Sequence, residues 1–277
     1  MFLRGGDFIF SNVINSAILA AEKSCFSDFS GCELDNTGLF VCPVCGKRKQ
    51  TRVRGRIIPC QCGCDIAAEK EARQKRALEE RISRNIEKGV TDRRYLSQTF
   101  EVDRNFNPEI SNRCRKYVEN WQAVKERNIG LLLYGNTGTG KTFFSCCIGN
   151  ALLQTGVRVL ITSLPRLVQD RIESVKIGKS PVNLKAFELL ILDDFGCGNI
   201  NQTIYQIIDD IYVSQIPLIV TTNLSPKQLT EPNTMEEKRI FDRVLEMCAA
   251  RILVNGTPLR REIARQKAEF VEQLFKD

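Results

Sequence analysis

The feature that most constrains this chain is the glycine-rich stretch Gly135-Asn-Thr-Gly-Thr-Gly-Lys141-Thr142, which follows a short apolar run ending at Tyr134. It fits the pattern G-x-x-x-x-G-K-[ST], in which glycines permit a tight loop whose backbone N–H groups surround phosphate oxygens. Lys141 would reach the β- and γ-phosphates, and the Thr142 hydroxyl would bind Mg²⁺. The residues expected to contact the nucleotide are Gly135, Asn136, Thr137, Gly138, Thr139, Gly140, Lys141, Thr142 and Phe143.

The segments on either side of this loop supply the context that the pattern requires. The apolar run before it suits a strand, and residues 143–153 contain no proline and suit a helix. The N-terminus of such a helix adds a positive dipole end to the anion site. The sequence therefore predicts a strand–loop–helix unit that binds ATP with Mg²⁺.

Two later apolar runs end in polar side chains. Residues 187–194 are expected to form a buried parallel strand that ends in Asp193 and Asp194. Asp193 would hold Mg²⁺ through water, and Asp194 would polarise the attacking water. Residues 216–223 form a further strand with Asn223 at its carboxyl end, where an amide can orient that water. Because strands alternate with helical segments, we expect a doubly wound, mainly parallel α/β sheet.

Two arginines lie beyond these strands on one predicted helix. Arg239 and Arg243 are four residues apart, so they share a helix face, and no carboxylate partner is obvious in the sequence. Such arginines suit a contact with the γ-phosphate bound by a neighbouring subunit. The alternative is surface ion pairing with Glu236 or Glu246.

Length and composition bound the remaining organisation. At 277 residues the chain can hold one sizeable core and a smaller module. It has no run of about 18 apolar residues, so we expect no membrane span. The apolar stretch 8–21 is interrupted by Asn12 and Asn15, which favours a short buried helix over a signal peptide. A cytoplasmic protein is expected.

The cysteines point to a metal site. The chain has twelve cysteines and no histidine, a composition that suits reduced thiols in a nucleotide-binding protein better than a disulfide scaffold. The two clusters, C-P-V-C and C-Q-C-G-C, resemble the knuckles of a zinc ribbon, in which four thiolates hold Zn²⁺. The candidate ligands are four of the five residues Cys42, Cys45, Cys60, Cys62 and Cys64. The sequence leaves open whether Cys62 or Cys64 is the fourth ligand.

Positive charge is concentrated around this module. Residues 46–94 carry fifteen Lys/Arg against seven Asp/Glu, which accounts for the whole net charge of +7. The basic loop between the clusters could contact nucleic-acid phosphate or an acidic partner, or be a solvated face. Residues 65–89 are expected to form an exposed helix capped by Asp65. The expected domains are a zinc-binding module over 1–64, a connecting helix over 65–90 and an ATPase domain over 91–277.

These motifs together resemble a known family. The order GNTGTGKT, LLILDDFG, TTNLSPKQL and RIFDRVLEMC, followed by residues 252–260, is similar to the DnaC/DnaI/IstB group of AAA+ ATPases, the bacterial and phage helicase loaders. The resemblance covers residues 99–260, and the cysteine module resembles that of zinc-bearing loaders. It implies an AAA+ RecA-like P-loop NTPase core that assembles as a spiral or hexamer.

The resemblance also implies roles for individual residues. Arg243 would act as an arginine finger in trans with support from Arg239, Arg260 would be sensor II in cis, and Asn223 would be sensor I. The helix over 163–179 would line single-stranded DNA, and the zinc module would grip the replicative DNA helicase. The implied catalytic set is Lys141, Asp193, Asp194, Asn223, Arg239, Arg243 and Arg260.

Two departures from the family pattern are visible. Ile211 stands where many members have an arginine, so the DNA contact made by that arginine is in doubt here. A further amphipathic helix over 263–275 extends past the usual end. It could pack on the core or on a partner, and we expect the core.

Three functions fit these observations. The first is an ATP-dependent loader of the replicative helicase onto single-stranded DNA. The second is an IstB-like transposition helper that acts on duplex DNA. The third is a zinc adaptor whose nucleotide site is a switch with negligible turnover, which Asp194 in place of the commoner glutamate would suit.

Overall fold

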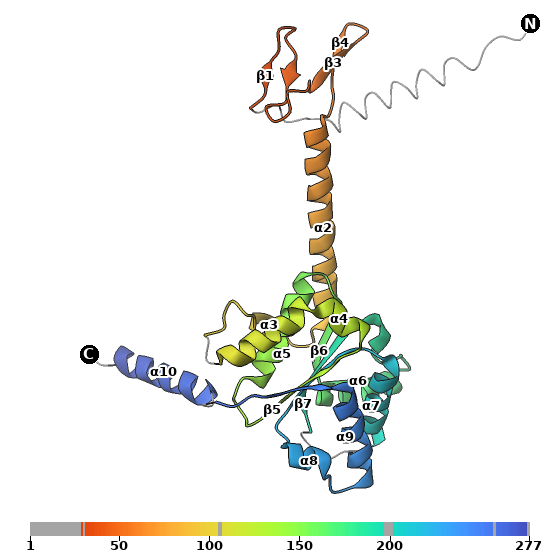
Figure 1. Ribbon diagram of the computed structural model, residues 1–277, viewed down its shortest axis with the longest axis vertical. Coiled ribbons are helices and arrows are strands. Elements are labelled where there is room, and N and C mark those ends of the chain that lie inside the picture. Colours follow the sequence, from red (N-terminus) through yellow and green to blue (C-terminus); the bar gives the residue numbers. More distant parts are fainter. Residues whose placement is uncertain (1–28, 30, 105–106, 197–201, 257–258, 276–277) are drawn as a thin grey trace, which may run out of the picture. The chain divides into compact units, whose positions relative to one another are not determined.

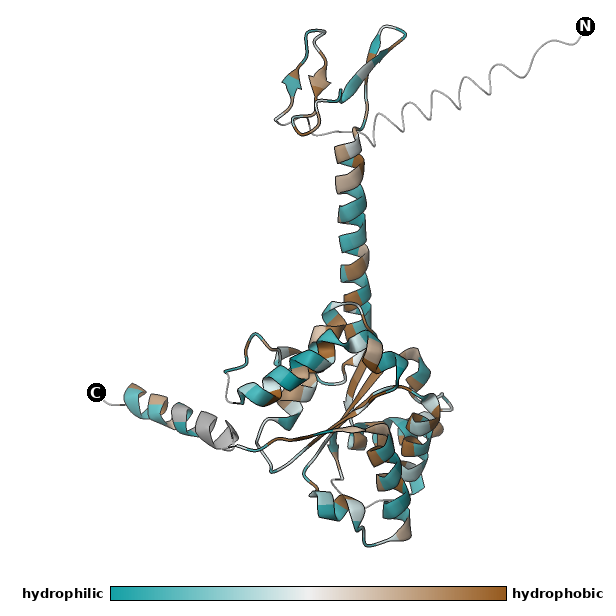
Figure 2. Ribbon diagram, viewed as in Figure 1, coloured by the Kyte–Doolittle hydropathy of each residue, from teal (hydrophilic) through white to brown (hydrophobic). Residues whose placement is uncertain are grey.

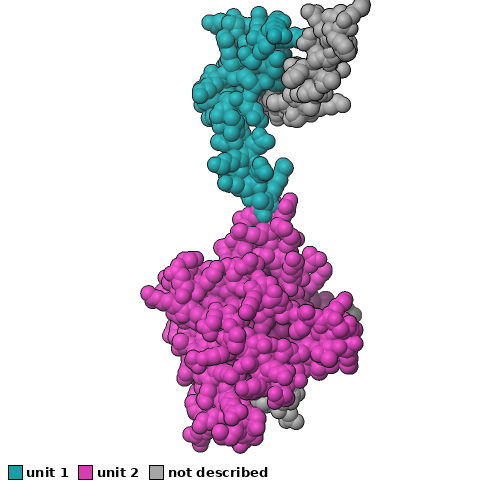
Figure 3. Space-filling model, turned by 90° about the vertical axis from the view of Figure 1, so that its right-hand side faces the viewer, with its two compact units in different colours: residues 1–77 teal, residues 78–277 magenta. Residues whose placement is uncertain are grey.

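The computed structural model describes residues 29, 31–104, 107–196, 202–256 and 259–275, with the side chains of 259–264 and 266 excepted. The chain divides into two compact units, residues 1–77 and 78–277, which Figure 3 colours separately. Helix α2 (Gly63–Gly89) runs through this division. The predicted domain borders at 64 and 90 remain predictions, and each unit is described by itself.

The larger unit contains a five-stranded sheet of order β6-β7-β8-β5-β9, in which every strand pair is parallel (Figure 1). The strands are β5 (Leu131–Tyr134), β6 (Val159–Ser163), β7 (Leu189–Phe195), β8 (Leu218–Thr222) and β9 (Ala250–Leu253). They are short and apolar, as strands buried on both faces must be. The predicted mainly parallel α/β core is confirmed.

Helices cover both faces of this sheet, because successive strand residues point to opposite sides. On one face, Leu131 and Leu133 of β5 pack with α3 and α5; on the other, Leu132 packs with α6, α7 and α9. In Figure 2 the strands form the apolar centre and the helices carry their polar residues outward. The helices are α3 (Pro108–Glu119), α4 (Trp121–Glu126), α5 (Lys141–Gln154), α6 (Leu164–Lys176), α7 (Gln202–Ser214), α8 (Pro226–Thr230) and α9 (Met235–Met247).

The sheet register brings the predicted polar residues to one edge. Tyr134 at the end of β5 pairs with Thr222 at the end of β8, and Ser163 of β6 pairs with Asp193 of β7. The phosphate loop follows β5, and Asn223 follows β8 directly. Because the carboxyl ends of parallel strands share an edge, the loop and the polar side chains lie on adjacent strands.

The last turns of α2 pack against the loop that enters β6. Asn85 donates from Nδ2 to the Gly156 carbonyl at 3.0 Å. A Cβ on Gly89 would lie 2.0 Å from the Val159 carbonyl oxygen, so only glycine fits there. The larger unit also contains two short 3₁₀ segments, η1 (Arg93–Ser97) and η2 (Leu184–Ala186).

The smaller unit holds two hairpins, β1 (Glu33–Leu34) with β2 (Phe40–Val41), and β3 (Gln50–Val53) with β4 (Arg56–Pro59). Asp65 does not precede α2 as its cap, because the helix already begins at Gly63. The Asp65 carboxylate lies in the first turn, accepts from the Cys62 N–H at 3.2 Å and pairs with Lys49.

Helix α10 (Leu259–Leu274) differs from the expectation for the C-terminus. The prediction that its apolar residues pack on the core is wrong, since Phe270 and Leu274 are each 60% exposed and Phe275 is 82% exposed. Arg260 lies in the first turn of α10, and its predicted sensor role falls on a side chain outside the described residues.

Within the described part of the chain, no helix is both long enough and apolar enough to span a bilayer.

Candidate nucleotide site and thiol cluster

The phosphate loop adopts a backbone that its glycines make possible. Gly135 has φ 140°, and a Cβ there would lie 2.5 Å from the Val254 carbonyl oxygen. Gly140 is left-handed at φ 100° and occupies the N-cap of α5. Both conformations disfavour any residue with a Cβ. The N-terminus of α5 therefore opens directly onto the loop, as an anion site requires.

The lysine of the motif lies across this loop. Lys141 is buried, and its Nζ donates to the carbonyls of Gly135 at 2.9 Å and Asn136 at 2.6 Å. The Thr139 hydroxyl donates to the same Asn136 carbonyl at 2.9 Å and fixes the turn. Asn136 and Thr137 are exposed at the loop tip.

Asp193 is the centre of a buried hydrogen-bond network. Its Oδ1 accepts from the hydroxyls of Thr142 at 2.8 Å and Thr221 at 2.6 Å. Burial raises the pKa of Asp193 because the charged carboxylate is desolvated, and the two hydroxyl bonds oppose that shift. The structure thus brings together the loop threonine and the first carboxylate, which the sequence had assigned to one metal ion.

This arrangement fits Mg²⁺. A buried carboxylate and a hydroxyl side by side are hard oxygen donors, and a divalent cation would offset the desolvation of Asp193. Magnesium is bound in nucleotide sites by one or two such groups together with the phosphates. Thr142 and Asp193 are the residues that would hold it.

The second carboxylate has a strained backbone. Asp194 is exposed and has φ 54°, a left-handed conformation that is uncommon for residues other than glycine. Its N–H donates to the Thr221 hydroxyl at 3.0 Å, so one threonine holds both acidic residues. Thr221 was not singled out in the sequence, although its place two residues before Asn223 marks it as part of the same edge. Asn223 is exposed at the end of β8.

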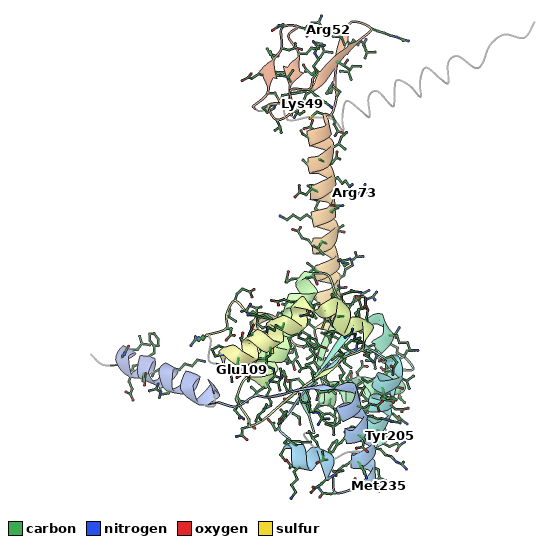
Figure 4. The ribbon with its side chains drawn as sticks, in the orientation of Figure 1. Lys49, Arg52, Arg73, Glu109, Tyr205 and Met235 are labelled. Atoms are coloured by element: carbon green, nitrogen blue, oxygen red, sulfur yellow. The ribbon has the colours of Figure 1, made fainter. Side chains whose placement is uncertain are left out.

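The two arginines of α9 have different surroundings. Arg243 forms an ion pair with Asp209 of α7, with 2.7 Å between Nη1 and Oδ1. Its guanidinium also lies over the rings of Tyr205 and Tyr212, at 5.0 Å and 5.5 Å from their centres. Figure 4 labels Tyr205 on α7. Arg239, one turn away, is exposed.

Arg243 therefore has a carboxylate partner that was not obvious in the sequence. The partner is neither Glu236 nor Glu246 but Asp209, which is distant in sequence. Glu246 instead accepts from the Tyr212 hydroxyl at 3.0 Å, an interaction that raises the pKa of Tyr212. Only the packing of α7 against α9 brings these groups together.

Helix α6 is the helix predicted to line single-stranded DNA, and one of the basic side chains of that segment is already engaged within the fold. Arg171 pairs with Asp210 of α7. Arg166, Lys176 and Lys179 are exposed.

The smaller unit brings four thiols together. The Sγ atoms of Cys42, Cys45, Cys62 and Cys64 all lie within 4.8 Å of one another. The expectation that Cys62 and Cys64 are alternatives for the fourth ligand is wrong, because both belong to this group. The one of the five candidates left out is Cys60, whose Sγ lies 3.3 Å from the Arg48 carbonyl. The sequence could not make this choice because C-x-C-x-C offers three thiols for two places.

The thiol chemistry suits a zinc ion. Backbone N–H groups of Cys45 and Val44 lower the pKa of Cys42 to about 7, which favours the thiolate. The neighbouring thiols and burial instead raise the pKa values of Cys62 and Cys64, because thiolates side by side repel one another, and a bound cation would relieve that repulsion. Four sulfurs at tetrahedral Zn–S distances of about 2.3 Å would lie roughly 3.8 Å apart, close to the observed grouping. In described residues 31–62 the buried side chains are few: Leu39, Cys42, Lys49 and Cys62. So small a core needs a metal staple.

Comparison with known proteins now decides the family. A model of the family described as IstB-like ATP binding protein matches residues 63–267, about three quarters of the chain. The chain belongs to this family. It is an IstB/DnaC-type AAA+ ATPase family member, as the motifs predicted. The match begins at Gly63, so Cys42 and Cys45 lie outside it.

Individual relatives agree with this assignment. The IstB-like chain is 30% identical over 139 residues to an ATP-binding protein of insertion sequence IS1162 from Pseudomonas fluorescens, which covers 45% of this chain and 60% of that protein. It is 28% identical over 158 residues to the chromosomal replication initiator protein DnaA of Acinetobacter baumannii, covering 54% of this chain and 33% of DnaA. The matches thus span less than two thirds of each relative.

A solved structure supports the fold. The crystal structure of the DnaC helicase loader superposes with a TM-score of 0.51 at 20% identity, over 59% of this IstB-like chain and all of the loader chain. At that identity the likeness concerns the fold alone.

Proposed function

We propose that this IstB-like protein hydrolyses ATP and loads the replicative DNA helicase onto single-stranded DNA. The proposal rests on the combination of two observations: a phosphate loop with the Thr142 hydroxyl beside the Asp193 carboxylate, and a separate module with four clustered thiols. The AAA+ core explains ATP binding, and three of the four thiols, those of Cys42, Cys45 and Cys62, precede the part of the chain that matches the IstB-like family. An added metal-binding module suits a dedicated protein partner.

In this proposal each site residue has a task. The loop N–H groups and Lys141 bind the phosphates, while Thr142 and Asp193 hold Mg²⁺, which screens the charge on the β- and γ-phosphates. Asp194 and Asn223 orient the attacking water. Arg243, supported by Arg239, reaches the γ-phosphate bound by the next subunit of a spiral or hexameric assembly, with Arg260 acting in cis.

The experiment is co-purification with the host replicative helicase in the presence and absence of ATP, together with phosphate release on single-stranded and duplex DNA. Lys141→Ala should abolish ATP binding. Arg243→Ala should leave ATP binding intact and remove hydrolysis in the assembly, because the arginine acts on a neighbour's nucleotide. Normal ATP turnover by Arg243→Ala would refute the assignment of Arg243 to the nucleotide site of a neighbouring subunit.

A second candidate is a transposition helper, which the insertion-sequence relative favours. Stronger stimulation of hydrolysis by duplex than by single-stranded DNA, without helicase binding, would establish that candidate instead. Negligible phosphate release under every condition would favour a nucleotide-switched adaptor, consistent with the short, strained Asp194.

A further inference from the structure

We propose that the smaller unit carries a docking surface on its β3–β4 hairpin, and that this surface receives an acidic, apolar segment of a partner protein. The hairpin surface consists of Val53, Arg56 and Ile58, with Arg54 in the turn. Val53 is paired with Arg56, and Ile58 lies two residues beyond Arg56, so these three side chains share one face of the ribbon, whereas Ile57 is paired with Arg52 on the other face. The inference rests on the proposed function, under which the partner is the replicative helicase.

The first argument is apolar exposure. Val53 is 46% exposed and Ile58 38% on this face, and Ile57 is 50% exposed on the other face, all on a hairpin of four-residue strands. None of them belongs to the small core around the thiol cluster. Removing branched aliphatic side chains from water is worth about 1.5–3 kcal/mol each, and exposed apolar patches mark interaction sites more often than chance.

The second argument is the backbone. The sheet has two strands, with Thr51 opposite Ile58 and Val53 opposite Arg56. Within the described part of the unit no further strand pairs with β3 or β4, so the outer edges of this sheet keep free N–H and carbonyl groups that an extended segment can pair with. Apolar side chains beside an open edge provide both affinity and register.

The third argument is charge, since part of the basic loop is already engaged inside the unit. Arg48 pairs with Asp35, and Lys49 pairs with Asp65 at 3.0 Å. Arg52 donates to a backbone carbonyl of the β1–β2 loop at 3.2 Å. Figure 4 labels Lys49 and Arg52 in this unit. These three side chains serve the fold of the module.

Arg54 and Arg56 remain available. Both are exposed, and neither has an ion pair with a described residue. Residues 36–64 contain no aspartate or glutamate, so the surface is basic as well as apolar. A phosphate backbone would satisfy the arginines but not Val53 and Ile58, whereas an acidic, apolar protein segment satisfies both.

The hairpin turn adds a structural outlier. Arg54 has φ 49° and Gly55 φ 81°, a turn with two left-handed residues that usually begins with asparagine, aspartate or glycine. Arginine in that position costs roughly 1–2 kcal/mol. The turn therefore holds a guanidinium at the hairpin tip in spite of backbone strain, which is a pattern of functional sites.

The test measures binding of the full chain to the purified host helicase by fluorescence anisotropy. Val53→Glu/Ile58→Glu should weaken binding roughly tenfold or more. Arg54→Glu/Arg56→Glu, which leaves the apolar residues in place, should weaken binding and flatten its salt dependence. The matched control is Ile66→Glu, an isoleucine 55% exposed on α2 of the same unit, which should bind as the wild type does.

The outcomes distinguish a failure of the surface assignment from a failure of the proposed function. If both hairpin variants bind the helicase as tightly as the wild type does, the surface assignment is overturned and the proposed function stands. No binding by the wild type overturns the proposed function. If the arginine variant loses single-stranded DNA binding but still binds the helicase, the arginines serve nucleic acid and the proposal is refuted. If a hairpin variant has a lower melting temperature but unchanged helicase binding, the chain itself covers the hairpin, and the proposal is again refuted.

Discussion

The ion pair between Arg243 and Asp209 makes a sharp prediction about the ATPase cycle. If Arg243 acts on a neighbour's nucleotide, its guanidinium must first leave Asp209 and the two tyrosine rings. The pair then competes with assembly. Asp209→Asn removes the charge, keeps the shape of the side chain and should raise the ATPase rate at protein concentrations where assembly is incomplete.

The size of the effect follows from the exposure of the pair. The side chains of Arg243 and Asp209 are 25% and 42% exposed, so solvent screens the interaction and about 0.5–1 kcal/mol is a reasonable value. The contacts of Arg243 with the two tyrosine rings are present in both the wild type and the variant, so they do not contribute to the free-energy difference between the two proteins. Without this stabilisation of the state in which Arg243 is paired, the population of subunits with a free Arg243, and hence the ATPase rate, rises roughly two- to fivefold.

The assay is phosphate release as a function of protein concentration, without DNA. Asp209→Asn should reach half-maximal activity at a lower concentration than the wild type, with an unchanged plateau. The control is Asp210→Asn, the same change one residue along α7, which breaks the pair with Arg171 instead. A slower Asp209→Asn enzyme of normal melting temperature would refute the reasoning, because it would mean that the pair holds Arg243 in its working position.

Three further predictions concern the scaffold. Cys60→Ser should retain one bound zinc per chain by metal analysis, whereas Cys62→Ser should lose it; equal loss in both would contradict the thiol grouping. Gly89→Ala should lower the melting temperature by roughly 5–10 °C because its Cβ would strike a backbone carbonyl, while Gly63→Ala, with nothing within 4 Å, should not. Burial raises the pKa of Glu188, but hydrogen bonds from the Lys125 ammonium and the Arg158 backbone N–H, together with the positive charges of both side chains, outweigh burial and hold the pKa below 4.5, so its stabilisation is complete above that pH and is lost as the pH falls through the lowered pKa. Glu188→Gln should therefore melt earlier than the wild type at pH 7 and converge with it as the pH falls through the lowered pKa, and a gap that widens in acid would count against that sign.

The α/β core was largely readable from the sequence because its determinants are local. The loop from Gly135 to Thr142 carries its own conformational signature, and the apolar runs that became β7 and β8 are continuous. The predicted stripe of α7 is also observed, since Ile204, Ile207, Ile208 and Ile211 are buried. These features follow from residue type and spacing along a single segment.

Other features depend on contacts between distant segments. The carboxylate partner of Arg243 was not obvious in the sequence because Asp209 lies in another helix, and no spacing rule joins positions on two helices. The choice of Cys42, Cys45, Cys62 and Cys64 over Cys60 depends on how two loops approach each other.

The sequence by itself determined a phosphate-binding loop, an ordered set of acidic and amide side chains, a basic cysteine module and membership of a family. The tertiary structure alone decided which groups meet: Thr142 and Thr221 on one oxygen of Asp193, four thiols in one cluster, and an arginine held between two tyrosines and a carboxylate. The physical reason is that local geometry is fixed by neighbouring residues, whereas hydrogen bonds and ion pairs across the fold are fixed by the register and packing of whole elements.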